Sequence, residues 1–291
     1  MKGFVRKIRD KLAPDRMVGR EFDGFRIEEK IAKGGMSTIY RAAGAGMSKA
    51  AVKILDEEFC RSQNSASHFI FEAELIESIS HPGIVKGISH GAIDGSRLYT
   101  VMEYLEGTDA GSLIRGSGPI EPEKALAIAL QACRGLAEVH GRRVMHRDVK
   151  PDNMMVGPGG LVKLLDLGIA KALSAGSEDT WDGKIYGTIY FVAPEQTIGN
   201  RYDERADIYS AGVSLYRMLT GSHPFESDDM RKLIFLIQNM TPRPPSDAGP
   251  GRGISPGVDG LVMKALSKKP SERFQSAAEM AGAVECCLGA K

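Results

Sequence analysis

The sequence predicts an α+β fold with two lobes, a sheet-rich first half with one main helix and a larger helical second half. Short strand-like runs bounded by glycine or polar turns extend from Phe22 to about Leu105, and long helical patterns dominate from Leu113 onward. The 291 residues, 42% of them hydrophobic, are enough for a sizeable core in each half. We expect a ligand site in the cleft between the halves.

The elements follow from the spacing of apolar residues. In the first half we expect one helix over 65–79 and strands that include 25–27, 38–40, 50–54 and 98–102. In the second half we expect helices over 123–140, 204–219, 228–239, 258–267 and 276–287.

Composition excludes several classes of protein. Lys and Arg number 38 and Asp and Glu 37, so the bulk charge does not call for a nucleic-acid partner. The four cysteines form no C-x-x-C pair and suit reduced thiols in a cytosol. No apolar run approaches the roughly 18 to 20 residues of a membrane span. We therefore expect a cytoplasmic protein, with the inner surface of the membrane as an alternative location.

Residues 1–20 form a basic extension with seven Lys and Arg and two Asp, a local charge of +5. Phe4, Ile8 and Leu12 recur every four residues, which predicts a short helix that ends before Pro14. Such a helix could lie on the domain surface, contact acidic lipid or act as an autoinhibitory arm.

A turn between two strands carries Gly34 and Gly35, and small residues there allow backbone N–H groups to approach phosphate oxygens. A Gly-Gly pair between strands is also common in simple hairpins. The next strand after that hairpin contains Ala51-Val-Lys53-Ile54. It places a lysine among apolar residues, where it could point into the cleft. The helix over 65–79 offers Glu72 and Glu74 as partners, and because they lie about 200° apart only one can face Lys53.

The strongest motif is His146-Arg147-Asp148-Val-Lys150-Pro-Asp152-Asn153, followed after a short loop and a strand by Leu165-Asp166-Leu167-Gly168. Over about residues 22–288 the chain resembles the bacterial branch of the eukaryotic-like, Hanks-type serine/threonine protein kinases. The resemblance implies a bilobal protein kinase domain over 21–291, with an N-lobe over about 22–105 and a C-lobe over 106–288.

The resemblance also implies the roles of single residues. Asp148 would orient the acceptor hydroxyl and accept its proton, and Lys150 would neutralise charge on the γ-phosphate. Lys53, paired with Glu72 at the family's spacing before His81-Pro82, would contact the α and β phosphates. The metal ligands would be Asn153 and Asp166.

The implied cofactors are ATP and Mg²⁺, with Mn²⁺ as an alternative. Adenine needs a flat apolar slot with backbone hydrogen bonds at one edge, although each slot residue taken alone fits an ordinary core position. The residues expected around the nucleotide are Ile31, Ala32, Lys33, Gly34, Gly35, Met36, Ser37, Ile39, Ala51, Lys53, Met102, Glu103, Leu105 and Met155. Ala32 and Ser37 stand where the family's G-x-G-x-x-G pattern has its outer glycines.

A long polar segment between Asp166 and Ala193-Pro194-Glu195 resembles the activation loop. Thr180 is the first candidate for phosphorylation, with Ser174 and Ser177 as others, and the phosphate would dock on Arg147, helped by Lys171. Thr188 resembles the residue that contacts Asp148 and Lys150 and favours Ser/Thr acceptors, or it is a second phosphosite. Three residues resemble scaffolding positions, namely Asp207 and the pair of Glu195 and Arg273.

The function implied is transfer of the ATP γ-phosphate to Ser/Thr hydroxyls of proteins, including autophosphorylation of the activation loop. The implied partners are protein substrates and a second copy of the chain for phosphorylation in trans. A pseudokinase scaffold would have lost a catalytic residue. A small-molecule phosphotransferase would not be expected to carry Ala-Pro-Glu and Gly-Thr-x-x-Tyr. The sequence names neither the substrate nor the activating signal.

Overall fold

The computed structural model describes residues 15–168, 189–199 and 201–289. Internal contacts divide the chain into two compact units, each with its own core. The first comprises Met1–Ser78 and Lys86–Tyr104, and the second comprises Ile79–Val85 and Leu105–Lys291. The two units are described separately below.

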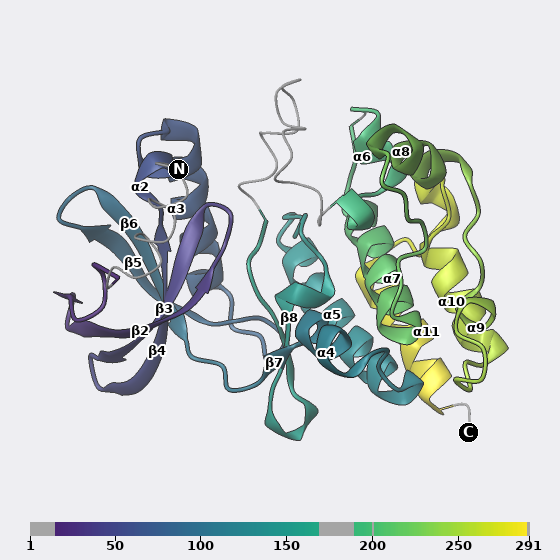
Figure 1. Ribbon diagram of the computed structural model, residues 1–291, viewed down its shortest axis with the longest axis horizontal. Coiled ribbons are helices and arrows are strands. Elements are labelled where there is room, and N and C mark those ends of the chain that lie inside the picture. The colour runs from purple at the N-terminus through teal and green to yellow at the C-terminus, as the bar shows by residue number, and fades with distance from the viewer. Residues whose placement is uncertain (1–14, 169–188, 200, 290–291) are drawn as a thin grey trace, which may run out of the picture. The chain divides into compact units, whose positions relative to one another are not determined.

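The first unit is a six-stranded antiparallel sheet in the order β1-β2-β3-β4-β6-β5, drawn in purple and blue in Figure 1. Helix α3 packs against β5 and β6. The elements are β1 (Glu21–Phe22), β2 (Phe25–Lys33), β3 (Ser37–Gly44), β4 (Met47–Leu55), α2 (Glu57–Cys60), α3 (Gln63–Ser78), β5 (Gly87–Ile93) and β6 (Arg97–Glu103). The expected helix and the four expected strands of this half are all present.

The core of this sheet is made by alternate apolar residues on neighbouring strands, including Ile27, Tyr40, Val52 and Val101. The register of β4 is fixed on both sides, so that Lys53 lies opposite Ile39 on β3 and opposite Thr100 on β6. A one-residue slip would move Lys53 to the other face, and the buried alternation prevents that slip.

The second unit is mainly helical, drawn from teal to yellow in Figure 1. Its helices are α4 (Ala110–Ser117), α5 (Pro122–Gly141), α6 (Pro194–Thr197), α7 (Arg205–Thr220), α8 (Met230–Asn239), α9 (Pro245–Ala248), α10 (Pro256–Ala265) and α11 (Ala277–Gly289). Helix α7 is buried almost all round, as a central helix must be, and α5, α10 and α11 each contact it. The five helices expected in this half are all present.

A small antiparallel sheet of β7 (Thr108–Asp109), β8 (Met154–Val156) and β9 (Val162–Leu164) also belongs to the second unit. Only the strand before Leu165 is expected from the sequence. The 3-10 turn η1 (Pro151–Asn153) precedes β8, so this sheet fixes one end of the His146–Asn153 loop. Within residues 15–168, 189–199 and 201–289, no helix is both long and apolar enough to cross a bilayer.

Candidate functional site

Lys53 and Glu72 form a buried ion pair in the first unit. The Lys53 Nζ atom lies 2.6 Å from Glu72 Oε1, and the two side chains are only 11% and 10% exposed. Strand β4 supplies the lysine and helix α3 the carboxylate. Glu74 is exposed, so Glu72 is the glutamate of this helix that faces Lys53. A charge buried at this depth needs a partner of opposite sign, and the pair meets that need.

The turn between β2 and β3 consists of Gly34, Gly35 and Met36. The Gly34 amide donates to the Ser37 carbonyl at 2.8 Å, which closes the turn. A side chain at Gly35 would meet no atom within 4 Å, and the backbone there is not left-handed. Neither packing nor backbone geometry therefore requires glycine at position 35.

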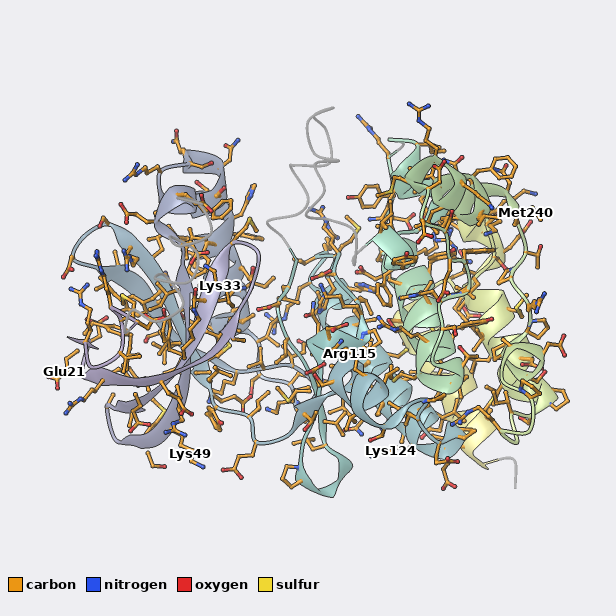
Figure 2. All side chains as sticks on the ribbon, viewed as in Figure 1. Glu21, Lys33, Lys49, Arg115, Lys124 and Met240 are labelled. Carbon is orange, nitrogen blue, oxygen red and sulfur yellow. The ribbon has the colours of Figure 1, made fainter. Side chains whose placement is uncertain are left out.

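A polar cluster at the base of this turn was not predicted. The Lys33 Nζ atom pairs with Asp56 and donates to Thr38 Oγ1 at 3.2 Å, and Thr38 Oγ1 donates to Asp56 Oδ1 at 3.1 Å. The Asp56 amide donates to the Met36 carbonyl at 2.9 Å. Lys33 (labelled in Figure 2) and Asp56 thus tie both strands of the turn to the end of β4.

The residues expected around adenine lie in both units. Ala51 and Met102 are buried side by side on paired strands, and Ile39 is partly buried, whereas Ile31 is 47% exposed. Ala32 pairs with Ile39 across the β2–β3 ladder. The Glu103 amide donates to the Lys86 carbonyl at 3.0 Å. Leu105 and Met155 belong to the second unit, where both are partly buried.

Asp207 holds the start of the His146–Asn153 loop in the second unit. Its carboxylate accepts hydrogen bonds from the backbone amides of His146 at 2.7 Å and Arg147 at 2.8 Å, and His140 Nε2 lies 2.9 Å away. Arg147 has φ 63, in the left-handed region that disfavours a side chain, and these bonds hold it there. Burial lowers the pKa of His146, which favours the neutral form of its ring.

The Asp148 carboxylate is oriented by two side chains of the same loop. Lys150 Nζ lies 3.1 and 2.9 Å from its two oxygens, and Asn153 Nδ2 donates to Oδ2 at 2.9 Å and to the Asp148 carbonyl at 2.8 Å. The Asn153 carbonyl in turn accepts from the Leu165 amide at 2.9 Å, which ties the loop to the Asp166 motif. The structure thus brings Asp148, Lys150 and Asn153 into one hydrogen-bonded group.

Asp166 and Gly168 follow β9, directly beside that loop. Asp166 has φ 44, a second left-handed residue without a glycine's freedom. The Gly168 amide donates to the His146 carbonyl at 2.7 Å, and a Cβ at Gly168 would lie 2.7 Å from the Cβ of Asp148. Glycine is therefore required at this position by close contact. Leu167, between them, is buried.

The expected brace between Glu195 and Arg273 is present. The guanidinium, fully buried, makes two bonds of 2.7 Å to the carboxylate and also donates to the carbonyls of Ser267, Lys268 and Arg205. This pair anchors α6, at the end of the segment that follows Asp166.

Several expected residues lie outside the described part of the chain. They are Thr188, Lys171, Ser174, Ser177, Thr180 and the basic residues before Asp15. Their roles stay predictions.

A cluster around Arg217 was not predicted from the sequence. It comprises Tyr190 and Phe191 of η6 (Ile189–Phe191), Arg217 of α7, and His223, and is called the Arg217 cluster below. The His223 ring stacks on Tyr190 with ring centres 4.2 Å apart. One signal could have indicated it, since Arg217 interrupts a helix whose other residues are nearly all small or apolar.

Comparison with known proteins agrees with this geometry. Residues 25–283 match the family profile described as "Protein kinase domain". The chain is 35% identical over 262 residues to "Serine/threonine-protein kinase PknB" of Mycobacterium leprae, covering 89% of this chain and 42% of that protein. It is 34% identical over 263 residues to "Serine/threonine-protein kinase pkn3" of Myxococcus xanthus, covering 87% of this chain and 48% of that protein.

The fold has a match among solved structures. The crystal structure of the PknI kinase domain of Mycobacterium tuberculosis superposes with a TM-score of 0.70 at 25% identity, covering 92% of this chain and 97% of that one. The expected fold class, a sheet-based N-lobe and a helical C-lobe, is confirmed. The chain spans less than half the length of the two sequence relatives. The chain belongs to the protein kinase family, in the bacterial branch of Hanks-type serine/threonine kinases that its motifs resemble.

Proposed function

We propose that this chain is a protein kinase that transfers the γ-phosphoryl group of ATP to Ser and Thr hydroxyls of protein substrates. The observation that carries the proposal is the hydrogen-bonded group of Asp148, Lys150 and Asn153 in one loop, held by Asp207. Phosphoryl transfer requires mainly positioning and charge neutralisation, and this group supplies both.

Asp148 is suited to hold the acceptor hydroxyl. Its carboxylate accepts hydrogen bonds from Lys150 and Asn153 of the same loop, and an ionised carboxylate can accept the proton of a hydroxyl. Lys150 lies close enough to Asp148 to share its charge with a phosphate oxygen beside the same hydroxyl. The acceptor proton then passes to Asp148 as the new P–O bond forms and the bond to the leaving ADP breaks.

Members of this family use ATP and a divalent metal ion, and the residues here fit one. Both amide hydrogens of Asn153 are directed at Asp148, so its Oδ1 atom is the one left for a cation. No group of three or more His, Cys, Asp or Glu in the described part of the chain could hold a metal by itself. We infer that Asn153 and Asp166 hold Mg²⁺, or Mn²⁺, together with phosphate oxygens, and that the ion neutralises phosphate charge.

The β2–β3 turn supports nucleotide binding by the first unit. Glycine at position 35 is explained neither by packing nor by backbone strain, and close approach of a phosphate is a reason for it. The Lys53 ammonium, held by Glu72, would contact the α and β phosphates. Ala51 and Met102 offer an apolar surface to adenine.

Activation by phosphorylation of the loop after Asp166 is part of the proposal. The Nε atom of Arg147 is buried and has no hydrogen-bond partner among the residues described, and no ion pair is found for its guanidinium there. An arginine in this state favours an incoming phosphate. Phosphorylated Thr180 would supply it, with Ser174 and Ser177 as alternatives.

Thr180→Ala should therefore lower the initial rate of peptide phosphorylation about 10-fold or more, because a charge-assisted bond to Arg147 is lost. Initial rates of freshly purified protein, compared with those of Ser174→Ala and Ser177→Ala, measure this. An unchanged rate for Thr180→Ala would rule out Thr180 as the activating site.

We further propose trans-autophosphorylation between two copies, contact of residues 1–20 with anionic lipid, and a cytoplasmic location. All four cysteines are free thiols, which suits a reducing compartment. The concentration dependence of autophosphorylation tests the first, since a reaction between copies is second order. Co-sedimentation with vesicles containing phosphatidylserine, before and after removal of residues 1–14, tests the second.

Incubation with γ-labelled ATP, a divalent metal and a generic protein acceptor tests the main proposal. We expect label on Ser and Thr and not on Tyr, lost when the metal is chelated. Label on Tyr alone, or label transfer without a divalent metal, would contradict it.

A further inference from the structure

Arg217 is a cation without a counter-ion in the described part of the second unit. It lies in the last turn of α7, partly buried, and its Nε atom is buried with no hydrogen-bond partner there. None of the ion pairs found among the described residues involves it. A partly buried guanidinium without a carboxylate is unfavourable, because desolvation is not repaid.

The two carboxylates whose charges act on His223, Glu226 and Asp152, each have a partner other than Arg217. Glu226 accepts from the His223 amide at 2.9 Å, and its side chain is 3.5 Å from His223 Nδ1. Asp152 is paired with Arg115, labelled in Figure 2, at 2.5 Å. What Arg217 does contact is aromatic, since its guanidinium carbon lies 5.8 Å from the centre of the Phe191 ring.

His223 does not compete with Arg217 for an anion. Burial and, to a smaller extent, the positive charge of Arg217 lower the pKa of His223 to about 4. The ring is therefore neutral near pH 7. It stacks on Tyr190 and meets Phe191 edge-on at 5.5 Å, so it fixes the η6 turn. The single positive charge of the Arg217 cluster is carried by Arg217.

The helix face that carries Arg217 also carries the contacts to the catalytic loop. Ser210 Oγ donates to the Phe191 carbonyl at 2.6 Å, and Ser214 Oγ donates to the Val149 carbonyl at 3.4 Å. Ser210, Ser214 and Arg217 follow each other at intervals of four and three residues, so they share one face of α7. The Arg217 side chain thus lies on the same face of α7 as the two serines that bond to η6 and to Val149, the residue after Asp148.

We propose that Arg217 binds an anionic side chain of the protein substrate, a carboxylate or a phosphate, beside the acceptor residue. The proposal rests on the proposed kinase function and names the substrate class, proteins whose acceptor Ser or Thr has an acidic or already phosphorylated neighbour. Such a group would supply the missing counter-ion, and the stacked Tyr190 and His223 would hold the turn against which the peptide lies. A guanidinium binds either oxyanion by two parallel hydrogen bonds.

The test compares peptide sets in which Glu, phosphoserine, Ala or Lys is placed in turn at each position around one acceptor. We expect wild-type kcat/KM to be about 10-fold higher with an anion than with Lys at one position, from one charge-assisted pair. Arg217→Glu should reverse the preference at that position, and Arg217→Met, which keeps the packing on Phe191, should abolish it. Comparing kcat/KM of the Glu peptide with that of the phosphoserine peptide shows which anion is preferred.

Arg243→Glu is the matched control, because Arg243 is an exposed cation in the same unit, and it should leave the preference unchanged. Thermal unfolding of each variant shows whether it is folded. A second measurement does not need catalysis, namely the Kd of the same peptides with the acceptor replaced by Ala, measured by fluorescence anisotropy with the full chain.

The outcomes separate this proposal from the proposed function. Charge-dependent binding that is lost in Arg217→Glu, in a protein that phosphorylates nothing, would keep the anion site and overturn the kinase activity. Phosphorylation and binding that ignore charge, or a preference that survives in Arg217→Glu, would overturn the anion site. A preference that Arg243→Glu abolishes equally would overturn it as well, since it would report bulk charge only.

Discussion

At the scale of single residues, three described non-glycine residues of the second unit have left-handed backbone, namely Arg143, Arg147 and Asp166. Each such residue is unfavourable by about 1 to 3 kcal/mol and persists only where its surroundings hold it. For Arg147 the restraint is visible, because Asp207 accepts both its amide and that of His146. Arg147 directly precedes Asp148 in sequence, and Asp166 belongs to the motif that is tied to the same loop, where accurate placement matters most.

Asp207→Ala should therefore lower both activity and stability. The change leaves the amides of His146 and Arg147 and the His140 ring without their acceptor, so the free energy of unfolding should fall by about 3 to 5 kcal/mol and the transfer rate of folded protein by about 100-fold. Urea unfolding and initial rates measure these. Asp203→Ala, which breaks a more exposed pair with Arg205, should change stability by less than about 1 kcal/mol. An active, stable Asp207→Ala protein would show that the His146–Asn153 loop keeps its conformation without Asp207.

His223 makes stability depend on pH in a predictable direction. Its pKa is lowered from 6.5 to about 4 in the fold, so below pH 6.5 the unfolded chain takes up a proton that the folded chain refuses. The effect of His223 on the free energy of unfolding is nearly constant above pH 6.5. As the pH falls from 6.5 toward 4, this free energy decreases. Between pH 7 and pH 5 this should remove about 2 kcal/mol of unfolding free energy.

The check is urea unfolding at pH 7 and pH 5 for wild type and His223→Phe, which keeps an aromatic ring against Tyr190. The variant should lose about 2 kcal/mol less than wild type over this interval. Equal losses would mean that His223 is protonated in the folded protein.

At the scale of elements, the brace between Glu195 and Arg273 should stabilise the fold without taking part in catalysis. Arg273→Ala leaves a buried carboxylate and three carbonyls unpaired, so unfolding free energy should fall by about 3 to 5 kcal/mol. Arg134→Ala, which removes an exposed pair with Glu285, should cost less than about 1 kcal/mol. Normal stability together with lost activity in Arg273→Ala would contradict a purely structural role.

Long elements were predictable and short ones were not. Helices α5, α7, α10 and α11 repeat their apolar positions over several turns, which is enough to show a helical period. Helices α2, α6 and α9 have four residues each, too few for any period, and strands β7 and β8 are equally short. These elements are supported by contacts with other helices and strands, which the local sequence does not encode.

The candidate site also has a part that the sequence predicts and a part that it does not. Asp148, Lys150 and Asn153 lie within six residues of one loop, so their grouping could be predicted from the motif. The Arg217 cluster joins residues from η6, α7 and the turn after α7, and recognising it requires knowing which face of α7 meets η6. The Lys33 and Asp56 contact was missed for the same reason, since 23 residues separate them.

At the scale of the whole molecule, one short segment belongs to a different unit from its neighbours in sequence. Residues 79–85 stand between α3 and β5 in sequence but pack in the second unit. The Leu164 amide donates to the Gly83 carbonyl at 2.8 Å, and the Val85 amide donates to the Leu164 carbonyl at 3.0 Å. The chain therefore passes from the first unit into the second and back, so two further connections join the units before Leu105.

The central claim is that Asp148 directs phosphoryl transfer to a protein hydroxyl. Its most direct test is the initial rate of transfer from γ-labelled ATP to a protein acceptor by wild type and by Asp148→Asn, which keeps the side-chain shape but removes its charge. We predict that the variant unfolds at a similar temperature and loses activity by about 100-fold or more. A wild type that transfers no label, or a variant as active as wild type, would contradict the claim.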